Sequence, residues 1–199
     1  MSSLIDVIAQ QLGGENLRKM SSQIGADEQA TGSAVSAALP LLLKALARNA
    51  SNDDGAHSLS RALTKDHDGS ILDGLGNFLQ NPQAGPGEGI LGHVFGSRRP
   101  TIERGLSRSS GLDTANIGKL MAMLAPIVMG ALGKAQRQEK LDSRSLAGYL
   151  NKEQERLERK EPQTMGVLGK LLDADRDGDV DMGDLARHGF GMLGKFFRR

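Results

Sequence analysis

The chain has 199 residues, enough for one large domain or two small ones. Hydrophobic residues make up 38% of the chain and aromatic residues only 3%, so a core must be built mainly from aliphatic side chains, Met and Ala. The absence of Cys excludes disulfides, thiolate metal sites and cysteine nucleophiles. A net charge of +1 gives no overall reason to expect a nucleic-acid partner.

The first residues have no basic run, and Asp6 interrupts their apolar stretch. We therefore expect no signal peptide and a cytoplasmic protein. The longest apolar run, Met121 to Leu132, is expected to be too short to span a bilayer.

The apolar residues of the first half recur at helical spacing, and no alternating run predicts a strand. Gly25 is expected to end a helix in the left-handed conformation, and Asp27 to cap a long helix through Ala50. Pro40 is expected to kink or split that long helix. Further helices are expected around Leu4 to Leu12, Leu17 to Ile24, Leu59 to Leu63 and Ile71 to Leu79.

The segment Asn81–Gly89 holds two Pro and three Gly in nine residues, which predicts an irregular linker. The halves on its two sides resemble each other. The sequence around Pro40 matches that around Pro126 at an offset of 126 − 40 = 86 residues, and Gly25-Ala26-Asp27 matches Gly111-Leu112-Asp113 at the same offset. This spacing favours an internal duplication over chance similarity between Leu- and Ala-rich helices.

Three stretches together resemble a known family: ALPLLLKALARNA, KDHDGSILDGL, and the long segment ILGHVFGSRRPTIERGLSRSSGLDTANIGKLMAMLAPIVMGALGKA. They are similar to the bacterial domain of unknown function 937 (DUF937), a helical family related to YidB-like proteins. The resemblance covers about Leu4 to Leu150. It implies a helical fold and a bacterial source, and it implies no activity.

We therefore expect an all-α, multihelical protein with two related helical units and a C-terminal helix-loop-helix that resembles an EF-hand. The expected divisions are 1–80 for the first unit, 81–89 for the linker, 90–160 for the second unit and 161–199 for the EF-hand-like segment. The charged run Lys152 to Glu161 is expected to form an exposed helix or a helical linker to the EF-hand-like segment.

The strongest chemical pattern is a twelve-residue stretch that contains six aspartates. Its order, D-x-D-x-D-G-x-V-x-x-x-D, resembles the calcium loops of EF-hands and especially of dockerins, with Gly178 at the sharp turn and Val180 pointing to a core. Ca²⁺ takes six to eight oxygen ligands, which this loop can supply. The candidate ligands are Asp173, Asp175, Asp177, Asp179, Asp181 and Asp184. Asp184 replaces the usual Glu at position 12, which leaves affinity and selectivity over Mg²⁺ open.

The alternative interpretation of this stretch is a solvated acidic turn, which leaves the alternation of acids unexplained. Apolar residues in Met165–Leu172 and Leu185–Phe197 predict the entering and exiting helices of one hand. A partial copy around Asp66 and Asp68 lacks ligands at both ends of the loop. It predicts a turn with Asp68 capping the next helix rather than a second metal site.

The remaining patterns favour structural interpretations. Three copies of G-x-L-G-K lack the spacing of a phosphate loop and indicate close helix contacts. The methionines Met121, Met123 and Met129 are expected to fill the core rather than to line a partner groove. The basic stretch Arg98, Arg99, Arg104 and Arg108 has no interleaved aromatic residue and favours a solvated helix face over a nucleic-acid site.

The sequence contains no recognisable nucleophile and base arrangement. It therefore predicts a non-enzymatic, calcium-binding structural or protein-interaction protein, with a protein partner or self-association. The alternative is a nucleic-acid-associated protein that uses the basic stretch.

Overall fold

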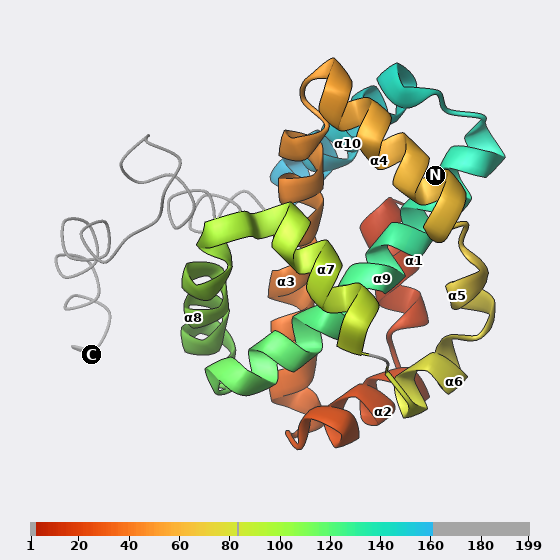
Figure 1. Cartoon of the computed structure of the whole chain (residues 1–199). Helices are drawn as coiled ribbons and strands as arrows, with labels where there is room; N and C mark the ends of the chain where they lie inside the picture. Colours follow the sequence, from red (N-terminus) through yellow and green to blue (C-terminus); the bar gives the residue numbers. More distant parts are fainter. Residues whose placement is uncertain (1–2, 83, 161–199) are drawn as a thin grey trace, which may run out of the picture.

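The computed structural model describes residues 3–82 and 84–160. Over these residues the chain forms ten α-helices, one 3-10 turn and no strand, which confirms the all-α fold class (Figure 1). The elements are α1 (Leu4–Gln11), α2 (Glu15–Ile24), α3 (Glu28–Asn49), α4 (Asp53–Asp66), α5 (Ser70–Asp73), α6 (Leu75–Gln80), α7 (Ala84–Phe95), η1 (Gly96–Arg98), α8 (Arg99–Ser110), α9 (Thr114–Glu139) and α10 (Ser143–Lys160).

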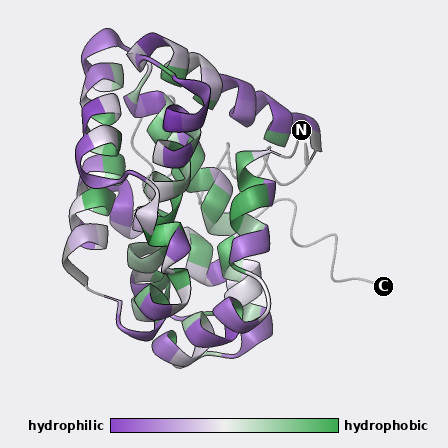
Figure 2. Ribbon diagram, turned by 90° about the vertical axis from the view of Figure 1, so that its right-hand side faces the viewer, coloured by the Kyte–Doolittle hydropathy of each residue, from purple (hydrophilic) through white to green (hydrophobic). Residues whose placement is uncertain are grey.

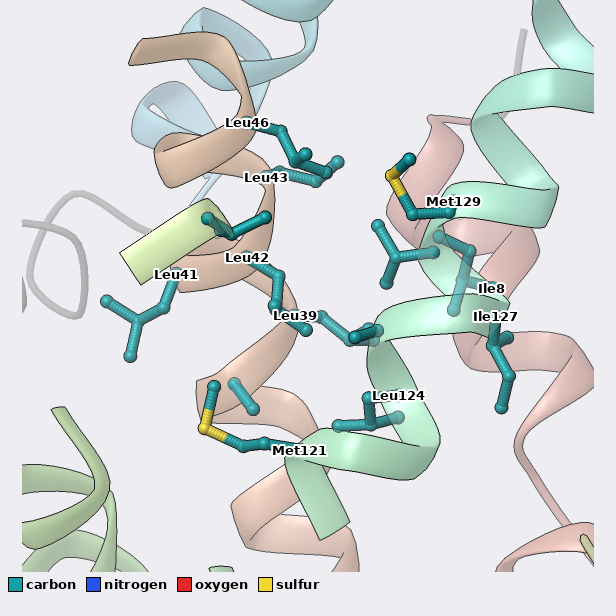
Figure 3. Close-up of a cluster of buried hydrophobic side chains, with 14 of the residues drawn as sticks. Ile8, Leu39, Leu41, Leu42, Leu43, Leu46, Met121, Leu124, Ile127 and Met129 are labelled. Atoms are coloured by element: carbon teal, nitrogen blue, oxygen red, sulfur yellow. The ribbon is translucent and has the colours of Figure 1, made fainter. Parts of the chain in front are cut away.

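Helix α9 runs through the middle of the fold and contacts α1 to α5, α7 and α8 (Figure 1). Every residue from Met123 to Gly133 is buried. A helix that is apolar on all sides belongs in a core rather than on a surface. Its side chains form one cluster with leucines of α3 and with Ile8 of α1, and Leu39 is directed toward α9 (Figure 3). The buried methionines Met121, Met123 and Met129 confirm the prediction that they fill the core.

The two long helices begin in the same way. Gly25 ends α2 with φ +72° and Gly111 ends α8 with φ +79°, both in the left-handed region that suits glycine. Asp27 then caps α3 and Asp113 caps α9, and each side chain accepts a hydrogen bond of 2.8 Å from the backbone N–H three residues later. The predicted caps and helix ends are confirmed at both places.

The helices around α3 and α9 pack in a reciprocal pattern. Helix α8, which precedes α9 in the chain, packs on α3, and α2, which precedes α3, packs on α9. Helix α10, which follows α9, packs on α3, while α4, which follows α3, packs on α9. Two duplicated units related by an approximate two-fold axis would pack in this way. That the two units superpose, with Pro40 and Pro126 equivalent, stays a prediction.

Pro40 does not split α3, which is one helix from Glu28 to Asn49. A proline removes the N–H that would bond the carbonyl four residues earlier. For Pro40 this carbonyl belongs to Ser36, which lies on an exposed side of α3, where water can replace the lost donor. The expectation of a split helix was therefore wrong, and a kink at Pro40 stays a prediction.

The expected irregular linker at Asn81–Gly89 is also shorter than predicted, because α7 begins at Ala84. Pro86 lies in the first turn of α7, where no helical N–H is needed. Gly87 lies against α9, and a Cβ there would come within 1.9 Å of the Ala122 carbonyl oxygen. That carbonyl has no helical donor because residue 126 is proline. The glycines that predicted a loop instead let two helices approach closely.

Two smaller expectations are corrected. The single helix expected from Ile71 to Leu79 is two short helices, α5 and α6, which meet at Gly74. The charged run expected to form an exposed helix lies in α10, but Glu153 and Leu157 are buried there, since α10 packs against α3 and α4. The charges on the other faces of α10 obscured this buried stripe in the sequence.

Helices α3 and α9 are long and apolar enough to cross a membrane by length and composition. The helix that contains the run Met121 to Leu132 is thus longer than that run and is not too short to span a bilayer. In the fold, 56% of the most apolar window of α3 and 72% of that of α9 are buried, as in the core helices of globular proteins. Figure 2 shows the hydrophobic residues along the inner faces of the helices and the hydrophilic residues on the outer ones.

Glycine also sets the contact between α9 and the chain after α4. A Cβ at Gly133 would lie 1.9 Å from the His67 carbonyl oxygen, and one at Gly130 would lie 2.4 Å from Cγ2 of Ile71. The segment Gly130 to Lys134 is thus a helical packing surface, which confirms the prediction of close contacts for this G-x-L-G-K copy.

We predict opposite effects for two Gly→Ala substitutions within α9. Gly133→Ala should destabilise the fold by at least about 2 kcal/mol, because the backbone at His67 must move to admit the methyl group. Gly118→Ala should stabilise it by about 0.5–1 kcal/mol, because alanine favours a helix and its Cβ would lie 3.6 Å from the nearest atom, on Glu103. Urea unfolding of both variants measures the difference, and equal stabilities would contradict the close contact.

Candidate functional site

The predicted calcium loop, Asp173 to Asp184, lies outside the residues that the structure describes. Its six candidate ligands, Asp173, Asp175, Asp177, Asp179, Asp181 and Asp184, therefore stay a prediction. Within residues 3–82 and 84–160, no group of three or more His, Asp or Glu side chains lies close enough to hold a metal ion.

The partial copy of the calcium pattern forms a turn between α4 and α5. The Asp68 carboxylate accepts a hydrogen bond of 3.0 Å from the Ser70 backbone N–H within the predicted turn. The turn is as predicted, but the N-cap residue of α5 is Gly69, so the prediction that Asp68 caps this helix was wrong. The bond from Ser70, together with a smaller contribution from Arg137 at 3.6 Å, lowers the pKa of Asp68 below its usual value. Gly69 has φ +95° and packs on Lys134, so the turn is held against α9.

The basic stretch is partly neutralised. Arg99 donates hydrogen bonds of 2.5 and 2.9 Å to the two carboxylate oxygens of Glu88 and one of 2.6 Å to Glu103. The bidentate Arg99 pair lowers the pKa of Glu88 and joins α7 to α8. Arg104 and Arg108 remain exposed on α8. With Arg99 taken by two carboxylates, the basic face is weaker than the sequence indicated.

This polar cluster borders a cavity of about 530 Å³ between α7, α8 and the first turns of α9. Gln23, Thr114 and Lys119 complete its polar lining, and Met123 contributes an apolar wall. Glu88, Arg99 and Glu103 pair with one another at this cavity, which is typical of an ion-pair network that fixes helix positions.

A buried carboxylate connects the two ends of the described chain. Glu153 on α10 has a side chain that is 2% exposed, and it accepts hydrogen bonds of 2.5 Å from the Leu4 backbone N–H and 2.7 Å from Arg156. Leu4 is the first residue of α1, whose N–H groups lack helical acceptors, so the carboxylate satisfies one of them. Burial, with Glu153 nearby, raises the pKa of Tyr149 to about 12. The arrangement is structural, because both carboxylate oxygens are engaged.

A second cavity, a trough of about 1,020 Å³, lies between α4 and α7. One face of each helix lines it, and Leu46 and Met129 contribute to the lining. His67 and His93 stand at its edge, and desolvation lowers the pKa of His67 despite the opposing effect of Asp66. This trough was not predicted from the sequence. The available signal was small residues at helical spacing in both helices, such as Gly55 and Ser58 of α4 and Pro86 and Gly89 of α7.

We expect Arg99→Met to destabilise the fold by about 1–3 kcal/mol, because it leaves the Glu103 carboxylate, 14% exposed, without its charged partner. Arg104→Met is the control, since Arg104 is exposed and bonds only Thr101 of its own helix among the described contacts. It should change the free energy of unfolding by less than about 0.5 kcal/mol.

The Arg99 effect should depend on pH. The pKa of Glu88 is lower in the folded protein than its ordinary value of 4.5, so the ionised form favours folding above that value. As the pH falls below about 4.5, this contribution is lost, and wild type and Arg99→Met should approach each other in stability. The contribution of Glu88 to this stability difference is small, because its half-exposed side chain is screened by water. If the difference in unfolding free energy between wild type and Arg99→Met became larger at acidic pH, the stabilising role of the ionised Glu88 carboxylate would be contradicted.

Comparison with curated proteins and with solved structures finds no match. The chain does match the family described as "Bacterial protein of unknown function (DUF937)" over residues 6–135, which is 135 − 6 + 1 = 130 of its 199 residues. The match begins in α1 and ends in α9, so it includes both long capped helices and the core between them. The chain therefore belongs to the DUF937 family of bacterial proteins.

Proposed function

We propose that this DUF937 member is a non-enzymatic, calcium-binding helical protein with a structural or protein-interaction role. One sequence observation carries the proposal. In the loop Asp173–Asp184, acids alternate at the positions where an EF-hand places its ligands, with Gly178 at the turn and Val180 at the core position.

The loop chemistry assigns a different part to each acid. Asp173 and Asp184 close the two ends of the loop through their carboxylates, whereas Asp179 contributes its backbone carbonyl and Asp181 acts through water. Asp175 and Asp177 complete the oxygen ligands. The six carboxylates repel one another when no cation is present, so Ca²⁺ binding is expected to favour a compact loop and to be coupled to local folding.

The rest of the proposal follows from composition and from the described contacts. No nucleophile and base arrangement supports an enzyme, and we place the protein in the cytoplasm with a protein partner or a second copy of itself. The nucleic-acid alternative is weakened by the pairing of Arg99 with Glu88 and Glu103. Retention on DNA that falls steeply with salt would favour that alternative.

Calorimetric titration of the metal-free full chain with Ca²⁺ tests the proposal. We expect one Ca²⁺ per chain. Asp173→Ala and Asp184→Ala should each weaken binding by at least about tenfold, or about 1.4 kcal/mol, because each removes a chelating carboxylate. Asp179→Ala should matter less, because its side chain is not the ligand.

Asp66→Ala and Asp68→Ala are the matched controls in the partial copy, and they should leave Ca²⁺ binding unchanged. The absence of both heat and a thermal shift up to about 1 mM Ca²⁺ would reduce the loop to an acidic turn. Equal losses at Asp173 and Asp179 would mean that the loop binds in another register.

A further inference from the structure

The trough between α4 and α7 has the form of a site for a helix. Its walls are single helix faces, since the lining residues recur at intervals of three or four in both helices. The residues are Gly55, Ser58, Leu59, Ala62 and Asp66 of α4, and Pro86, Gly89, Ile90, His93 and Val94 of α7. From Gly55 to Asp66 the wall extends about 16 Å at 1.5 Å per residue, the length of about three helical turns.

The lining of the trough is mainly apolar. Leu46 of α3 and Met129 of α9 contribute to this lining, together with Leu59 of α4 and Ile90 of α7. Gly89 is exposed, and a Cβ built on it meets nothing within 4 Å. An amphipathic helix that enters such a groove places residues i, i+3 and i+7 against the base.

The chain continues beyond a helix that packs on two of the elements lining this trough. Residues 161–199 follow α10, which packs on α3 and α4, and both of these helices contribute to the lining. These residues number 199 − 160 = 39, and each can span about 3.3 Å when extended. The total length of the extended segment is therefore far more than the width of a small domain. The segment after α10 is therefore long enough for its last residues to lie in the trough.

The last eleven residues, GFGMLGKFFRR, have the matching pattern. Phe190, Leu193 and Phe197 are spaced i, i+3 and i+7, and Phe196 borders the same face. Three of the five Phe residues of the chain are thus in this short segment, and each can bury about 150–250 Å². We propose that residues 189–199 dock as a short helix in the trough between α4 and α7 of their own chain.

Charge gives the helix its direction. Asn49, next to Arg48, donates a hydrogen bond to the His93 carbonyl shortly before α4 begins, whereas Asp66 is the last residue of α4, and Arg48, His93 and Asp66 all line the trough. The basic end of the segment, Arg198 and Arg199, therefore lies toward Asp66. The inference rests on the described trough and on the apolar pattern, and it does not depend on the proposed calcium function.

A single cysteine in this Cys-free chain tests the docking. Ser58→Cys places a thiol in the trough, and Thr64→Cys places one outside the trough lining on the same helix; both native residues are exposed. The labelling rate of Ser58→Cys by a maleimide is compared in two full-length backgrounds, one otherwise wild type and one that also carries Phe196→Asp and Phe197→Asp. We expect labelling to be at least about tenfold slower in the first, since tenfold protection means that the segment occupies the trough nine-tenths of the time. Thr64→Cys should react at the same rate in both backgrounds.

The labelling is run both in EDTA and in Ca²⁺, and protection in either condition supports docking even if the chain binds no Ca²⁺. Equal labelling of Ser58→Cys with and without the two Asp substitutions, in both conditions, would overturn the proposal. Protection that vanishes on dilution would also overturn it, because the trough would then be filled by a second copy.

Two glycine substitutions in α7 test whether the segment needs the trough to be open. The reporter is a thiol at Leu193→Cys in the segment. Gly89→Leu places a side chain in the trough, and the control Gly92→Leu adds the same side chain to α7 outside the trough lining. Both glycines are exposed with open space at Cβ, so neither change should disturb the fold. Gly89→Leu should raise the labelling rate of Leu193→Cys by about tenfold and Gly92→Leu should not. Equal rates in the two would overturn the assigned site.

Discussion

Close backbone contact with α9 is the constraint on which the described fold depends. At Gly87 the backbone of α7 reaches the carbonyl of Ala122, and at Gly133 the α9 backbone reaches the carbonyl of His67. Contacts of this kind need glycine on one side, because any Cβ would occupy the same space. They explain how a protein with 3% aromatic residues builds a dense core: the backbones come close, and aliphatic side chains fill the narrow space that remains.

Pro126 belongs to the same arrangement. Its missing N–H leaves the Ala122 carbonyl without a helical donor, and α7 covers that carbonyl with Gly87, whose Cα–H can make a weak contact to the oxygen. In α3 the corresponding carbonyl, of Ser36, lies on an exposed side of the helix. The same sequence element is thus accommodated by packing in one half of the molecule and by solvent in the other.

The described residues and the acidic stretch Asp173–Asp184 differ in the chemistry of their side chains. The helical body contains closed charge groups, such as Arg99 with Glu88 and Glu103, and Glu153 with Arg156 and the N-terminus of α1. These groups fix helices in place. The acids of Asp173–Asp184 have no basic residues of comparable number beside them, which is why a cation is the natural partner in the proposal.

The sequence by itself determined the local features. Gly25, Asp27, Gly111 and Asp113 predicted both helix ends and both caps, because caps are made within three or four residues of the chain. The order of acids likewise predicted a calcium loop whose ligands are all local, and that prediction stands on the sequence alone.

Only the tertiary structure decided the features that join distant residues. It turned the Gly- and Pro-rich segment before Gly89 into the first turns of α7, paired Arg99 with Glu88, and buried Glu153 against α1. The trough between α4 and α7 also arises in this way. In each case the deciding contact lies between residues far apart in the chain or on different helices, and the spacing of apolar residues within one helix carries no information about which helix covers it.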